Sequence, residues 1–153
     1  MRLVLILIFV GSKLFTSDIS VADKIISFAV QKIGKKVDRG ECWDLANAAL
    51  NYAGAQWEPP WNFGDKIDYK TQALKPADIL QFTNVKFVFP FGSASFPKHT
   101  AIVYKVRSLS DNKKQITLLH QNFNNKRFVD TLTIDLDNIK NGKIEAYHPK
   151  AKI

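Results

Sequence analysis

Residues 40–54 read GECWDLANAALNYAG, and this stretch says most about how the chain folds. Its apolar residues recur at steps of three and four, as expected for an amphipathic helix that begins near Cys42. Gly54 supplies the stop, because glycine readily adopts the left-handed conformation that ends a helix. Alanines on the buried stripe allow close packing, so we expect this helix to be central.

A second helix is predicted just before this one. From Asp18 the apolar residues again recur at helical spacing, as far as Ile33. Asp18 or Ser20 can cap its beginning, and Gly34 ends the pattern. Residues 35–40 are polar and form the connector between the two helices.

In the second half of the chain the apolar residues recur at every second position, as in a strand, instead of at helical spacing. Residues 55–75 contain Pro59 and Pro60 among several aromatic residues and are expected to be an irregular surface segment. Alternating patterns then predict strands over 78–82, 85–89, 99–106, 115–122, 128–134 and 144–147, with a turn at Asn141-Gly142 before the last. The predicted class is α+β, with N-terminal helices packed on a five- to six-stranded antiparallel sheet.

Composition limits the possible functions. With 153 residues, 46% of them hydrophobic and 24% charged, the chain has the composition of one globular domain, which we assign to residues 18–153. A single cysteine excludes an internal disulfide and a four-thiolate zinc site. The net charge of +8 favours an anionic polymer as a contact. Nucleic-acid binding is not favoured, since the lysines are scattered rather than aligned on one helix.

Residues 1–17 have the pattern of a signal peptide. Met1-Arg2 is a short positive start, and 3–10 is an unbroken apolar run that is too short for a membrane span. Cleavage near Lys13 or Asp18 is expected, which predicts a secreted, periplasmic or extracellular protein without an integral membrane segment after cleavage. The alternative is that the apolar run is a buried strand.

Cys42 and His99 are the first candidates for chemistry. The beginning of a helix favours a thiolate, because backbone N–H groups and the helix dipole stabilise negative charge there. A nucleophilic thiolate needs a base, and histidine is the usual one. His99 opens a predicted strand after Pro97-Lys98, at an end of the sheet.

His120 and Asn122 are the candidates for a third, orienting group. They close the next predicted strand and share a face with each other, since side chains alternate along a strand. His99 faces them only if the connecting turn has an even number of residues, or an odd number together with a bulge. Either side chain can then orient the ring of His99 by a hydrogen bond.

Each candidate also has a simpler interpretation. Cys42 can be a buried core residue, and His99 and His120 can be ordinary histidines bonded to backbone. A zinc site from these three side chains is chemically possible, but their spacing has no recognised zinc signature. His148, near the C-terminal end, is expected at the surface.

Four segments together resemble a known family. Gly40–Ala46 is similar to the nucleophile segment of papain-like cysteine peptidases and amidases of the CHAP and NlpC/P60 type, and 75–82 is similar to their Pro-Gly-Asp strand, with Ala77 replacing the glycine. His99–Val103 resembles their histidine strand, and 119–123 the segment with the third polar residue. Within this group, the sequences of the four segments are most similar to the cysteine-proteinase-fold domain of fungal actin-patch scaffold proteins.

The resemblance implies a secreted amide hydrolase that acts on peptides or peptidoglycan-like substrates without a metal or organic cofactor. Cys42 would attack, with its own backbone N–H stabilising the oxyanion, His99 would transfer protons, His120 would orient His99, and Asn122 would support that contact. Trp43, Trp57 and Trp61 would line the substrate cleft or cover the core. A tyrosine that NlpC/P60 enzymes place before the cysteine is missing here. Acyl transfer, and a non-catalytic scaffold module that binds peptide or glycan, remain alternatives.

Overall fold

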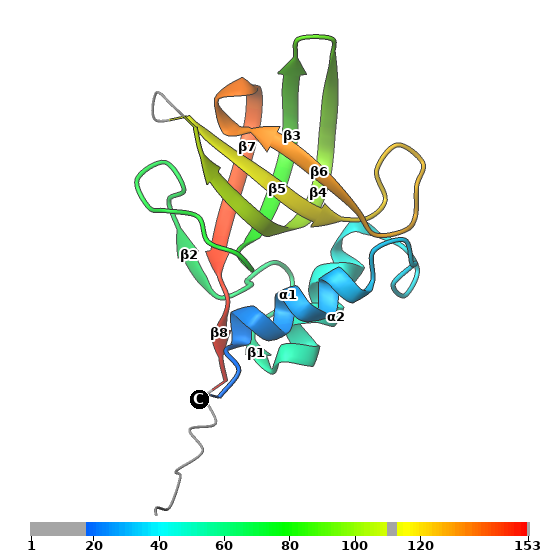
Figure 1. Cartoon of the computed structure of the whole chain (residues 1–153), viewed down its shortest axis with the longest axis vertical. Coiled ribbons are helices and arrows are strands. Elements are labelled where there is room, and N and C mark those ends of the chain that lie inside the picture. The colour runs from blue at the N-terminus through cyan, green and yellow to red at the C-terminus, as the bar shows by residue number, and fades with distance from the viewer. Residues whose placement is uncertain (1–17, 110–112, 153) are drawn as a thin grey trace, which may run out of the picture.

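The computed structural model describes residues 18–109 and 113–152. The predicted signal peptide, residues 1–17, lies outside the described residues. In the described part, two helices lie on one side of a curved antiparallel sheet (Figure 1). The predicted α+β arrangement of N-terminal helices on an antiparallel sheet is therefore confirmed.

Both helices begin where the sequence predicts. Helix α1 spans Val21–Gln31, and the hydroxyl of Ser20 accepts a hydrogen bond from the backbone N–H of Asp23. Helix α2 spans Cys42–Ala53, with Glu41 as its N-cap. Gly54 ends α2 at a φ of 67°, a conformation that a residue with a Cβ adopts only at a cost.

The main sheet has six strands in the order β2-β7-β3-β4-β5-β6, and all neighbours are antiparallel. The strands are β2 (Asp65–Ile67), β3 (Ile79–Phe89), β4 (Gly92–Ser108), β5 (Lys114–His120), β6 (Asp130–Asp135) and β7 (Ile139–His148). A short 3₁₀ helix, η2 (Leu136–Asn138), connects β6 to β7, and β1 (Ala55–Gln56) pairs separately with β8 (Lys150–Ala151).

Two of the sequence predictions about this sheet are wrong in detail. The predicted strands 78–82 and 85–89 are one strand, β3, with an irregularity at Asn84, whose φ is 51°. Asn141-Gly142 is not a turn but lies inside β7 beside this irregularity. A Cβ at Gly142 would lie 2.3 Å from the carbonyl oxygen of Asn84, so the close approach of two strands requires the glycine.

The two faces of the sheet form two hydrophobic cores. Ile79, Ile102 and Leu119 face the helices and pack with them. Their neighbours in the chain face the other way, and that second core includes Ile67 of edge strand β2 and Ile134 of edge strand β6. Because residues from both edges meet in one core, the sheet must curl around it.

Candidate active site

Cys42 is the first residue of α2, and its helix is anchored at this end by polar contacts. The carboxylate of Asp44 accepts from the backbone N–H of Glu41 at 3.0 Å and from the guanidinium of Arg39 at 2.9 Å. Asp44 is buried, so these bonds replace the water that its charge has lost. They hold the first turn of α2, and with it the position of Cys42.

Gln121 ties the loop before Cys42 to the end of β5. Its amide oxygen accepts from the backbone N–H of Val37 at 3.1 Å. Its amide nitrogen donates to the carbonyl oxygens of Val37 at 3.0 Å and Glu41 at 2.7 Å. Gln121 is only 1% exposed. This role of Gln121 was not predicted, although the residue lies between His120 and Asn122 and alternation turns it toward the helices.

Asn122 has a different role from the predicted one. Its side-chain amide donates to the carboxylate of Glu41 at 2.8 Å, instead of supporting the histidines. The same carboxylate pairs with Arg127 at 3.2 Å. Asn122 has a φ of 60°, a conformation that asparagine tolerates better than most residues. Asn122 therefore strengthens the connection between the end of β5 and the residue before Cys42.

The structure brings His99 and His120 together. Nε2 of His99 lies 3.0 Å from Nδ1 of His120, and the two rings meet edge to face. Five residues, 109–113, separate the paired residues Ser108 and Lys114, so the loop is odd. A bulge between Val103 and Lys105 restores the common face. The predicted contact is formed through the alternative that requires a bulge.

Burial keeps both imidazoles uncharged. His99 is 4% exposed and His120 is 3% exposed. Burial, and to a lesser extent the charge of His120, lowers the pKa of His99 from 6.5 to about 3. Burial lowers the pKa of His120 from 6.5 to about 4, although the charge of Asp130 acts in the opposite direction. Both rings are therefore neutral at neutral pH.

Aromatic side chains account for this burial. Phe96 lies with its ring centroid 4.8 Å from that of His99, and Phe82 and Phe123 lie at 6.2 and 6.3 Å. Phe123 also packs 5.4 Å from His120. Apolar rings exclude water from the histidines, which disfavours their charged forms.

The thiol of Cys42 lies beside β4. The backbone N–H of Thr100, the residue after His99, reaches the sulfur and favours the thiolate. Burial outweighs this contact and raises the pKa of Cys42 above its ordinary value of 9.0. The expected thiolate at the helix terminus is therefore not the resting form, because desolvation exceeds the effect of the helix N-terminus.

The three predicted cleft tryptophans form a cluster around Trp43, the residue after Cys42. Trp43 contacts Trp57 and Trp61 edge to face, with ring centroids 6.1 and 5.9 Å apart. The ammonium of Lys98 lies 4.4 Å above the ring of Trp61. Because Lys98 precedes His99, this cluster borders the histidine end of β4. Contact of these tryptophans with a substrate stays a prediction.

His148, which the sequence predicts at the surface, is half-buried there and makes a polar contact. Its Nδ1 lies 2.5 Å from a carboxylate oxygen of Asp78, a buried residue. The other oxygen of Asp78 accepts from the backbone N–H of Lys75 at 2.7 Å. Burial raises the pKa of Asp78 from 3.8, against the opposing effect of these bonds. The contact joins the beginning of β3 to the end of β7.

Among residues 18–109 and 113–152, no three His, Cys, Asp or Glu side chains are grouped so as to hold a metal ion. This gives no support to a zinc site from Cys42, His99 and His120. In the same part of the chain, no helix has the length and apolar character needed to cross a membrane.

This architecture is a cysteine-proteinase fold. Two helices pack on a curled antiparallel sheet, Cys42 begins the second helix, and two histidines pair on neighbouring strands of the sheet. Residues 11–152 match the sequence model of the AIM3/BBC1 cysteine proteinase-fold domain, and the chain belongs to this family. Altered inheritance of mitochondria protein 3 of Debaryomyces hansenii is 29% identical over 168 aligned residues. That alignment covers 92% of this chain but only 18% of the relative, so the chain corresponds to a small part of a much longer protein.

Two solved structures share the fold. One is the crystal structure of Ly7917 with the hydrolyzing product of MDP, with a TM-score of 0.54 and 15% sequence identity over 82% of this chain and 62% of that chain. The other is the crystal structure of Ly7917, with a TM-score of 0.51 and 16% identity over the same shares. At such low identity the similarity establishes the fold alone.

Proposed function

We propose that this chain is a thiol-dependent amide hydrolase in which Cys42 is the nucleophile, His99 the base and His120 the orienting group. The observation that carries the proposal is the buried contact of 3.0 Å between Nε2 of His99 and Nδ1 of His120. When His99 donates its Nε2 proton to His120, its Nδ1 is left as a free acceptor. A base needs such an acceptor. The backbone N–H of Thr100, the residue after His99, contacts the sulfur of Cys42, and the proposal requires Nδ1 of His99 to reach the same sulfur when substrate is bound.

The raised pKa of Cys42 and the lowered pKa of His99 determine when the proton is transferred in the first step. The S–H proton moves to Nδ1 of His99 as the sulfur attacks the amide carbonyl, rather than before substrate binds. The proton then passes to the departing amine, leaving an acyl thioester on Cys42. Water hydrolyses the thioester with His99 as the base, and the backbone N–H of Cys42 is the proposed donor to the oxyanion.

We propose peptides or peptidoglycan-like amides as the substrate class. Family resemblance supports this choice, and one solved structure of the same fold holds a hydrolysis product of MDP. The net charge of +8 suits an anionic polymer. No step requires a metal or an organic cofactor. Export through residues 1–17 remains part of the proposal and places this chemistry outside the cytosol.

A non-catalytic binding module is the second candidate. The neutral, almost fully buried histidines and the raised pKa of Cys42 favour it, since a resting ion pair is absent from the described site. The domain corresponds to 18% of its much longer relative, as expected for a module within a scaffold. In this case the same surface would bind peptide or glycan without cleaving it.

One experiment separates the candidates. Purified peptidoglycan fragments and peptides are incubated with the wild type, Cys42→Ser and His99→Ala, and products are identified by mass spectrometry. The hydrolase predicts amide cleavage by the wild type alone and an acyl adduct on Cys42, while added amines reveal acyl transfer. Binding without cleavage, equal in wild type and Cys42→Ser, would establish the module instead.

A further inference from the structure

The outer part of the β3–β4 hairpin extends beyond the rest of the sheet; we call residues 85–98 the finger (Figure 1). Strands β3 and β4 pair out to Phe89 and Gly92, which leaves Pro90-Phe91 as the turn. Pairing of β3 with β7 ends at Phe87, and pairing of β4 with β5 begins only at Ile102. Among residues 18–109 and 113–152, no third strand pairs with the finger beyond Phe87.

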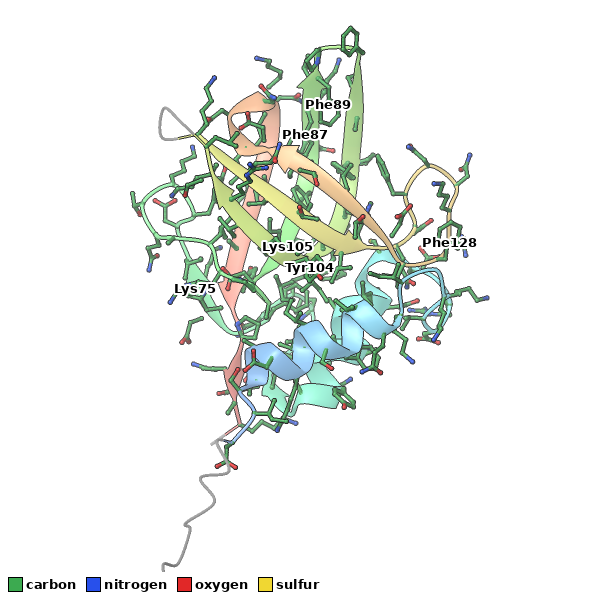
Figure 2. The ribbon with its side chains drawn as sticks, in the orientation of Figure 1. Lys75, Phe87, Phe89, Tyr104, Lys105 and Phe128 are labelled. Atoms are coloured by element: carbon green, nitrogen blue, oxygen red, sulfur yellow. The ribbon has the colours of Figure 1, made fainter. Side chains whose placement is uncertain are left out.

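The base of the finger is anchored and its tip is apolar and exposed. Phe87 and Phe96 are buried and pack against each other with ring centroids 5.5 Å apart. Phe91 at the turn is 104% exposed, and Val88 is 36% exposed. Figure 2 shows Phe87 and Phe89 on β3 along the same hairpin. An anchored base thus presents Phe91 and, in part, Val88 to solvent, where apolar surface is unfavourable, while half-buried Phe89 packs against the second core.

The charges around the finger are mainly positive. No acidic residue occurs between Asp78 and Asp111, a segment that includes both strands of the finger. Lys86 is exposed on β3, and exposed Lys140 lies on the adjoining end of β7. Asp137, on η2 at the base, is an acidic neighbour. An apolar tip beside the basic residues Lys86 and Lys140 complements a surface that is apolar inside and negatively charged outside.

We propose that the finger inserts its tip into the interface of a membrane that contains anionic lipids. Aromatic side chains favour the boundary between headgroups and acyl chains, and lysines beside them bind the lipid phosphates. The shape of the finger favours lipid over a protein partner. A stable protein interface buries about 800 Å² on each side, which a two-residue turn and its neighbours do not provide, whereas shallow insertion involves only the exposed tip, Phe91 and Val88.

Vesicle partitioning of the full chain tests the proposal. The wild type should bind vesicles of equal parts phosphatidylcholine and phosphatidylserine more tightly than vesicles of phosphatidylcholine alone. Phe91→Ser should lower the partition coefficient about tenfold and Lys86→Gln about fivefold. The matched controls are Phe128→Ser, an exposed phenylalanine on a separate loop (Figure 2), and Lys24→Gln on α1. They should change partitioning less than about twofold.

A local measurement makes the result independent of residues 1–17. Phe91→Trp adds an indole at the tip, and brominated lipids should quench its emission beyond the level seen for the wild type. Phe128→Trp should show no such excess. Equal partitioning of Phe91→Ser and wild type, or no added quenching in Phe91→Trp, would overturn the proposal. Concentration-dependent dimerisation that Phe91→Ser abolishes would also overturn it and assign the finger to a second copy of the chain.

Discussion

Nε2 of His99 lies 3.0 Å from Nδ1 of His120, although the loop that connects their strands has an odd number of residues. The β-bulge between Val103 and Lys105 makes the contact possible, because one extra residue on β4 returns His99 to the face of His120. The pair is enclosed by Phe96 and Phe123. The site is thus a buried, neutral histidine pair on β4 and β5, and Thr100, the residue after His99, contacts the cysteine that begins α2.

Removing one member of the pair should destabilise the fold. His120→Ala leaves Nε2 of His99 without its partner in an apolar surrounding, which costs about 1–3 kcal/mol. Urea unfolding at pH 7 measures the change in the free energy of unfolding. His120→Asn, which can still accept a hydrogen bond, should recover part of the loss. Equal stability of His120→Ala and wild type would contradict the buried contact.

Stability should fall as the pH falls from about 6.5 toward 4. An unfolded histidine binds a proton below 6.5, whereas the folded pKa values are about 3 for His99 and about 4 for His120. In this window the unfolded state holds more protons, and acidification favours it by about 1.4 kcal/mol per pH unit for each group. Above pH 6.5 both histidines are neutral in the folded and the unfolded state, so their titration no longer changes the stability. The raised pKa of Asp78 acts in the opposite direction from pH 3.8 upward, because the folded carboxyl keeps its proton where the unfolded one has lost it.

Chemical denaturation at several pH values checks this slope. His120→Gln should lower the slope by about half, since one of the two titrating groups is gone. A slope that is unchanged in His120→Gln would mean that other groups cause the acid sensitivity.

Cys42 should react slowly with alkylating agents at neutral pH. Burial raises the pKa of its thiol above 9.0, and only the thiolate attacks iodoacetamide. The rate of alkylation measured against pH should therefore have a midpoint above 9. Unfolding in urea should increase the rate at pH 7. A midpoint near or below neutrality would show a preformed ion pair with histidine.

Gln121→Ala should loosen the loop before Cys42. The substitution removes three hydrogen bonds, to the N–H and C=O of Val37 and to the C=O of Glu41. We expect a loss of about 2 kcal/mol or more in unfolding free energy, because the backbone groups at this buried contact lose their partner. Hydrogen exchange of residues 37–42 should also accelerate. Gln115→Ala, at the other end of β5, is the control and should leave that exchange unchanged.

Gly142→Ala should be one of the most damaging glycine substitutions. Its Cβ would lie 2.3 Å from the carbonyl oxygen of Asn84, and its φ is 93°. Gly34 has a similar φ of 76° but nothing within 4 Å of an added Cβ. Gly34→Ala should therefore cost only the backbone strain, about 1 kcal/mol, and Gly142→Ala at least about 2 kcal/mol more. Thermal unfolding of the two variants measures the difference, and equal losses would contradict the close approach of β3 and β7.

The helices and most strands were predictable because their signals are local. Spacing of three and four around Leu45 and Ala49, and Gly54 as a stop, depend on residues within a few positions of one another. The alternation of apolar and polar residues in 99–106 and 115–122 likewise predicts strands, whichever strands they pair with. Cys42 at the beginning of a helix and the histidines on neighbouring strands follow from these patterns.

Contacts between distant segments were decided only by the tertiary structure. The bulge beside Val103, the approach of Gly142 to Asn84 and the bonds of Gln121 to Val37 depend on strand register and loop placement. The protonation states of His99 and Cys42 also depend on burial by residues far away in the chain. Local sequence determines which conformation a segment prefers, but desolvation and pairing arise from what packs against it, and for this protein they turn an expected thiolate into a neutral thiol.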